Sequence, residues 1–109
     1  MVRLIFTTFS TSDDAAKVIR HLVEEGLAAC GTILPGARSV YLWKGEVEDT
    51  TEAVVIFKTT VEAYPRFEAR LKELHPYETP EIVAIDPAAV SGDYAAWVTA
   101  LVNNPNLQP

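Results

Sequence analysis

The sequence predicts an α+β domain with one antiparallel sheet and with its helices on one face of that sheet. Strand-like and helix-like segments follow one another in the order β-α-β-β-α-β, and a short final helix comes after them. The two longest strand-like segments, residues 28–43 and 46–60, are separated only by Lys44-Gly45, which favours a tight hairpin. A length of 109 residues with 49% hydrophobic and 22% charged residues is typical of one globular domain. We expect this domain to span residues 1–102 and residues 103–109 to be a frayed tail.

The first strand and helix are predicted from residue type and spacing. Residues 3–8 are apolar and β-branched with an alternating pattern, which is typical of a strand. Thr11 and Asp14 have the spacing of a capping box, so a helix should begin there, and Gly26 should end it. The expected apolar stripe of this helix is Ala15, Ile19, Leu22 and Val23.

The length of the hairpin arms predicts that the protein forms an oligomer. An arm of about 15 residues at about 3.3 Å each reaches about 50 Å, whereas a compact domain of this length is about 35 Å across. The arms must therefore bend or overhang, and Pro35-Gly36 is the expected position of a bend or bulge. An overhang would expose the apolar residues 40–43, so we expect a closed homo-oligomer in which neighbours cover it. The alternative is a hairpin that folds back over its own sheet.

The second half completes the pattern. A helix should follow Thr60, which can act as its cap, with Pro65 in its first turn and with an apolar face made of Tyr64, Phe67, Leu71 and Leu74. Residues 81–86 read as a fourth strand, and Gly92 introduces a last helix whose expected buried side is Tyr94, Trp97, Val98 and Leu101. The full order predicts a ferredoxin-like βαββαβ sandwich with a long hairpin and a C-terminal helix.

The loop between the second helix and the fourth strand is the strongest candidate for a site. Pro76 and Pro80 fix their own φ angles and bias His75 and Thr79 away from helical conformation, so this loop displays its polar side chains in fixed places. His75 is the best metal-ligand candidate, because neutral imidazole suits Cu(II), Zn and Ni and because carboxylates follow it at Glu78 and Glu81. An ordinary proline-rich connection with solvated polar groups is the alternative.

Composition excludes several classes of function. The net charge of −6 and the lack of a basic cluster argue against nucleic-acid binding. No apolar run is long enough for a membrane helix, and the chain goes straight into a strand pattern instead of a signal peptide, so we expect a cytoplasmic protein without membrane contact. Cys30 is the sole cysteine and is expected to be a small core hydrophobe, and no catalytic or certain cofactor-binding motif is present, so we expect no enzyme.

A family resemblance adds to this interpretation. The segments that carry it are Leu27-Ala28-Ala29-Cys30, Ile33-Leu34-Pro35-Gly36, Tyr41-Leu42-Trp43-Lys44-Gly45-Glu46, Lys58-Thr59-Thr60 and His75-Pro76-Tyr77-Glu78-Thr79-Pro80-Glu81. In this order and spacing, from about Leu4 to Leu101, the chain is similar to the CutA family of divalent-cation-tolerance proteins. The resemblance implies a very stable ferredoxin-like trimer, similar in architecture to the PII signalling proteins, with His75 and Glu81 as metal-binding positions. Some relatives carry a first-strand cysteine that falls near Thr7, so this chain lacks that thiolate.

Our functional hypothesis is that the protein is a homotrimer that takes part in metal-ion tolerance. It would bind a divalent cation, with Cu(II) as the preferred candidate, through His75 and Glu81 near a cleft between subunits. Further cleft-lining candidates are Tyr41, Trp43, Lys58, Tyr77, Glu78 and Cys30. One alternative is a PII-like signalling trimer in which Lys58, Trp43, Tyr41 and His75 surround an anionic metabolite. Another is a stable scaffold for other proteins.

Overall fold

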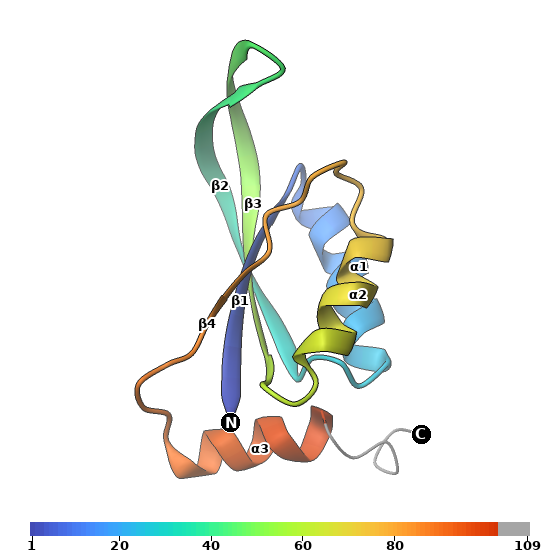
Figure 1. Cartoon of the computed structure of the whole chain (residues 1–109), viewed down its shortest axis with the longest axis vertical. Coiled ribbons are helices and arrows are strands. Elements are labelled where there is room, and N and C mark those ends of the chain that lie inside the picture. The colour runs from blue at the N-terminus through green and yellow to red at the C-terminus, as the bar shows by residue number, and fades with distance from the viewer. Residues whose placement is uncertain (103–109) are drawn as a thin grey trace.

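The computed structural model describes residues 1–102 and shows the predicted order of elements (Figure 1). The elements are β1 (Val2–Phe9), α1 (Ser12–Glu24), β2 (Cys30–Trp43), β3 (Glu46–Thr60), α2 (Tyr64–Leu74), β4 (Val83–Ile85) and α3 (Gly92–Val102). The expected tail at residues 103–109 lies outside the described residues.

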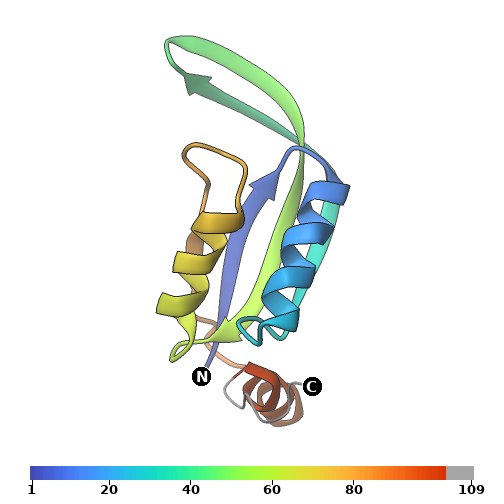
Figure 2. The ribbon, with the colours of Figure 1, turned by 90° about the vertical axis from the view of Figure 1, so that its right-hand side faces the viewer.

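One four-stranded sheet with the strand order β2-β3-β1-β4 forms the centre of the described chain, and each neighbouring pair is antiparallel. β1 pairs with the second half of β3, from Val2 opposite Thr60 to Phe9 opposite Ala53. β4 is shorter than the predicted strand over residues 81–86. Both α1 and α2 cover the same face of the sheet, whereas α3 lies across its end, close to the N-terminus (Figure 2). The predicted α+β class and helix placement are therefore confirmed.

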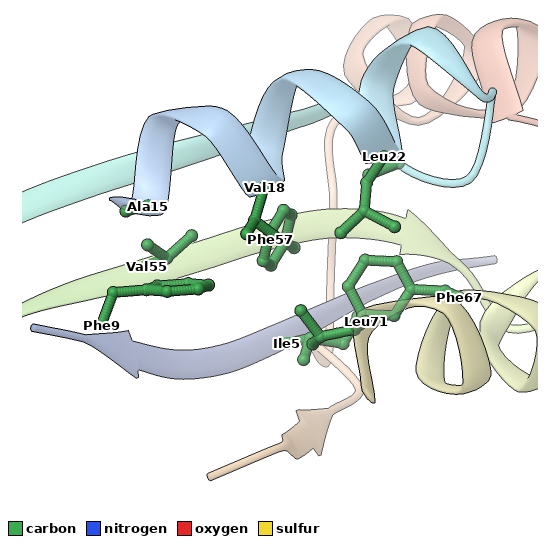
Figure 3. Packing of buried hydrophobic residues seen from close by; sticks show 10 residues of the cluster. Ile5, Phe9, Ala15, Val18, Leu22, Val55, Phe57, Phe67 and Leu71 are labelled. Carbon is green, nitrogen blue, oxygen red and sulfur yellow. The ribbon is translucent and has the colours of Figure 1, made fainter. Parts of the chain in front are cut away.

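The main core fills the space between the sheet and these two helices (Figure 3). Phe57 of β3 meets Phe67 of α2 edge to face, with ring centroids 5.1 Å apart. On α1 the fully or nearly fully buried residues are Ala15, Val18 and Leu22. The predicted stripe was therefore correct for Ala15 and Leu22 only, since Val18 is buried in the core, Ile19 is partly buried against it, and Val23 is partly exposed and lies outside the cluster.

Local hydrogen bonds fix the ends of the helices. The hydroxyl of Thr11 accepts from the amide of Asp14 at 3.0 Å, as the capping pattern predicts. Gly26 adopts a φ of 72°, in the left-handed region that glycine tolerates, and this ends α1. At α2 the N-cap position belongs to Ala63, so the prediction of Thr60 as the cap was wrong, although the Thr60 hydroxyl accepts from the Ala63 amide at 3.1 Å.

The hairpin of β2 and β3 projects beyond the rest of the molecule (Figure 1). The described chain measures 46 × 30 × 22 Å, and the strand register shifts between Leu34 and Ala37, as the Pro35-Gly36 step predicts. Near the tip, Leu42 and its partner Val47 are 69% and 71% exposed. The predicted overhang is thus confirmed, and the hairpin does not fold back over its own sheet. Its trimeric covering stays a prediction.

The buried side of α3 differs from the predicted one. Val98 and Val102 pack against Val2 and Ala63 in a second, smaller cluster. Tyr94 and Trp97 are instead 37% and 47% exposed, so their predicted burial was wrong. The helix carries apolar residues on all sides, and its spacing therefore did not indicate which side would meet the end of the sheet.

Candidate functional site

His75 is a buried residue at the junction of α2, β1 and the following loop. It follows the last turn of α2 with an extended backbone, and its side chain is 7% exposed. The ring stacks on Phe9 of β1 with a centroid distance of 4.3 Å. Its Nε2 lies 2.8 Å from the carbonyl oxygen of Thr8 and 3.2 Å from Oγ1 of Thr7.

The hydrogen bonds of His75 determine which nitrogen carries the proton. The amide of Tyr77 donates to Nδ1 at 3.1 Å, so Nδ1 presents its lone pair there. Nε2 is then the protonated nitrogen and donates to the carbonyl of Thr8. Burial lowers the pKa of His75, which keeps the ring neutral. In this arrangement neither nitrogen has a free lone pair for a metal ion.

Tyr77 links this histidine to a carboxylate on β3. Its hydroxyl donates to Oε2 of Glu52 at 2.6 Å and lies 3.2 Å from the hydroxyl of Ser10. Burial, reinforced by the Glu52 bond, raises the pKa of Tyr77 to about 12. Tyr77 therefore remains a hydrogen-bond donor at neutral pH and holds the Glu52 carboxylate, which is 7% exposed, in place.

A cavity of about 380 Å³ adjoins this pair, and we refer to it as the Glu52 pocket. Its walls come from the end of β1, the hairpin and the loop after α2, which lies below the overhanging hairpin in Figure 2. The lining residues are Thr8, Ser10, Tyr41, Trp43, Thr50, Thr51, Glu52, Tyr77, Glu78, Thr79 and Glu81. The pocket thus combines aromatic walls with three carboxylates and lies just beyond the last residue of β1.

Lys44 lies near the pocket but pairs with only one of these carboxylates. Its ammonium is 3.6 Å from Oε2 of Glu78 and 5.5 Å from the ring centroid of Trp43. Within residues 1–102, neither Glu52 nor Glu81 forms an ion pair with a cationic side chain. The pocket is therefore electronegative.

The structure brings most of the predicted cleft residues together. Tyr41, Trp43, Tyr77, Glu78 and Glu81 all line the Glu52 pocket. His75 lies behind the pocket and is connected to it through the Tyr77 amide.

Lys58 and Cys30, the other two predicted cleft residues, do not line the Glu52 pocket. They pair with each other across β2 and β3, six residues along β3 from Glu52, which corresponds to about 20 Å of strand. The Lys58 ammonium donates to the hydroxyl of Thr32 at 2.6 Å. The thiol of Cys30, which is only partly buried, lies 3.6 Å from the Tyr94 hydroxyl.

Glu52 and Thr50, which lie on β3 two positions apart and line the pocket, were not predicted from the sequence. A carboxylate directly before the apolar run 53–57 was the available signal, because a buried glutamate beside a core strand needs a specific partner. Its partner, Tyr77, is 25 residues away in the sequence and no spacing rule connects the two.

Residues 1–102 of one protomer do not complete a metal site. Within the described part of the chain, no three His, Cys, Asp or Glu side chains are close enough together to hold an ion. The three pocket glutamates share a cavity without forming a coordination shell. The donor set described for a single copy therefore does not fit a tightly bound metal ion.

Comparison with known proteins identifies the family. The family model described as "CutA1 divalent ion tolerance protein" matches residues 3–101. The chain belongs to the CutA1 family. The divalent-cation tolerance protein CutA of Thermus thermophilus is 41% identical over 98 residues, which cover 90% of this chain and 95% of that protein.

Solved CutA1 structures share the fold. A single-site variant of CutA1 from Pyrococcus horikoshii superposes with a TM-score of 0.90 at 35% identity, over 95% of this chain and 100% of that one. CutA from Archaeoglobus fulgidus, described as a periplasmic protein, gives 0.89 at 31% identity, over 94% and 99% of the two chains. No helix within residues 1–102 has the length and apolar character needed to cross a membrane. The cytoplasmic location expected from the sequence stays a prediction.

Proposed function

We propose that this CutA1-family protein acts in divalent-cation tolerance by binding the ion directly, without catalysis, as a ferredoxin-like homotrimer. Cu(II) is the first ion to test. The proposal rests on one observation about Glu81. This residue is an exposed carboxylate that lines the electronegative pocket, and it has no cationic partner among the described residues. The family relationship supports the tolerance role.

Glu81 and His75 have different parts in this proposal. Glu81 is accessible and is the ligand that one protomer offers. His75 uses both ring nitrogens to fasten the loop to β1, so it becomes a ligand only if the Tyr77 amide moves away from Nδ1. Since one protomer gathers no complete donor set, the remaining ligands come from a neighbouring copy or from water.

Charge disfavours the alternative of an anionic metabolite in the cleft. Among residues 1–102, the pocket lining contains three glutamates and no lysine or arginine. Lys58, the cation expected to hold the anion, lies elsewhere on the sheet. An anion in the Glu52 pocket would meet uncompensated like charge.

Cu(II) titration calorimetry with two pocket variants tests the proposal. Glu81→Gln is expected to weaken binding by about tenfold or more, because an amide is a much poorer ligand for Cu(II) than a carboxylate. Glu24→Gln, on the exposed face of α1, is the matched control and should leave the isotherm unchanged. An unchanged isotherm for Glu81→Gln would contradict the assignment.

Electron paramagnetic resonance separates the roles of the two residues. With Glu81 as the ligand and His75 outside the coordination shell, the Cu(II) spectrum should be the same for the unsubstituted protein and for His75→Gln. A nitrogen hyperfine pattern that disappears in His75→Gln would instead establish His75 as the ligand.

A further inference from the structure

We infer that the Glu52 pocket binds a small organic cation that carries a primary ammonium group. Four features of the pocket lead to this ligand class: its size, its aromatic walls, two carboxylates without a cationic partner in residues 1–102, and a buried hydroxyl without a hydrogen-bond partner there. The cavity of about 380 Å³ is in the range of small-molecule sites.

The aromatic walls of the pocket suit an organic cation. Tyr41, Trp43 and Tyr77 supply three aromatic rings, whose faces attract ammonium groups and whose apolar surface holds an aliphatic chain. A divalent metal ion gains nothing from such surfaces and needs several donor atoms close together, which the described residues do not gather. The aromatic lining is thus the feature that a metal site leaves unexplained.

The chain already places an ammonium in this kind of environment. Lys44 sits over the Trp43 ring and beside the Glu78 carboxylate at the edge of the pocket. Within residues 1–102, no comparable cation reaches Glu52 or Glu81. The pocket interior therefore offers the same combination of carboxylate and aromatic ring, with its charge still unpaired.

The hydrogen-bonding groups point to a primary ammonium instead of a quaternary one. The Oγ1 atom of Thr50 is buried and has no hydrogen-bond partner in the described chain. Thr50 and Glu52 alternate along β3, so their side chains lie on the same side of the strand. A primary ammonium carries three donors and can bond to both groups, whereas a quaternary ammonium has none.

Trp43 fluorescence provides the test of binding. In a Trp97→Phe background the signal comes from Trp43, and the probes are n-butylammonium, 1-butanol and tetramethylammonium, each with a chelator present. We expect a saturable change with n-butylammonium, a much weaker response to tetramethylammonium and none to 1-butanol. The chelator separates this result from metal binding, so either proposal can fail alone. Equal responses to n-butylammonium and 1-butanol, or no saturable response to n-butylammonium, would overturn the inference.

Two variants should change the affinity for n-butylammonium in opposite directions. Glu52→Gln should weaken binding about tenfold or more, because it removes the buried charge. Lys44→Asn should tighten binding about twofold to fivefold, because it frees Glu78 and the face of Trp43, and Asn tolerates the positive φ of 51° at this position. Lys17→Gln, on exposed α1, is the control for lost positive charge and should have no effect.

Nuclear magnetic resonance of the unsubstituted protein keeps the test independent of variant folding. Titrated n-butylammonium should shift the Trp43 indole N–H resonance and the Thr50 amide resonance, while those of Lys17 and Cys30 stay in place. Shifts spread evenly over the chain, or unchanged affinity in both Glu52→Gln and Lys44→Asn, would refute the site.

Discussion

His75 shows how a single side chain is fixed by partners that the sequence does not reveal. The proline-flanked loop made His75 a candidate site residue, and its position after α2 was predictable from spacing. Its acceptor and donor partners could not be inferred, because Thr8 lies 67 residues away and the pairing depends on how α2 packs against the end of β1. The difference between a free imidazole and one engaged at both nitrogens exists only in the folded chain.

The neutral state of His75 predicts a pH dependence of stability. Burial lowers its pKa in the folded protein below the ordinary 6.5, so the unfolded chain binds the proton more readily. The contribution of this group is complete above about pH 6.5 and is lost as the pH falls from there through the lower, folded-state pKa. The free energy of unfolding, measured with urea at fixed protein concentration, should therefore decrease between pH 7.5 and pH 5.5.

The variant His75→Gln tests whether His75 causes this pH dependence of stability. It should cost about 1 to 3 kcal/mol at pH 7.5, because buried hydrogen bonds are lost, and it should flatten the pH dependence. His21→Gln, on the exposed side of α1, should keep the original slope. The carboxyls of Glu25, Asp49 and Asp86 have lowered pKa values and stay ionised across this range. A slope that persists in His75→Gln would exclude the histidine as its source.

At the scale of helices and strands, the prediction agreed best with the structure where a few neighbouring residues determine the conformation. The hairpin, its bend and both ends of α1 followed from a few neighbouring residues such as Lys44-Gly45 and Thr11. The orientation of α3 did not follow, because an almost wholly apolar helix buries whichever side the end of the sheet provides. β4 was predicted too long, since only Val83–Ile85 pair with β1, opposite Leu4 to Phe6.

The contact between α1 and β2 predicts a cost for a larger residue at Gly31. A Cβ atom there would lie 2.9 Å from Cγ1 of Ile19, which is closer than side-chain contacts allow. Gly31→Ala should therefore lower the free energy of unfolding by about 1 to 3 kcal/mol, measured by urea denaturation. Gly92→Ala faces open space and should change stability by no more than about 0.5 kcal/mol.

A double-mutant cycle locates the cause of this cost. Ile19→Ala removes the atoms that the new Cβ would meet, so the double variant Ile19→Ala/Gly31→Ala should be more stable than the sum of the single effects predicts. Strict additivity would show that the crowding lies elsewhere.

At the scale of the whole molecule, the projecting hairpin predicts self-association. Val40, Leu42 and Val47 are each more than 60% exposed, and β2 and β3 extend well beyond β1 at this end. The unsubstituted protein should therefore behave as a trimer in light scattering at micromolar concentration. Leu42→Glu should dissociate it, because an unpaired carboxylate would be buried in the contact. Ala16→Glu, on exposed α1, should leave the assembly intact. A monomeric unsubstituted chain would refute the assembly.

The walls of the Glu52 pocket include Tyr41 and Trp43. Both belong to the projecting hairpin that we expect a neighbouring copy to contact. Ligand binding in the pocket and association of the subunits are then linked equilibria. A ligand bound beside Trp43 changes the affinity of neighbouring copies for one another, and their association changes the affinity for that ligand by the same factor. A small charged ligand would in this way change the stability of the whole oligomer.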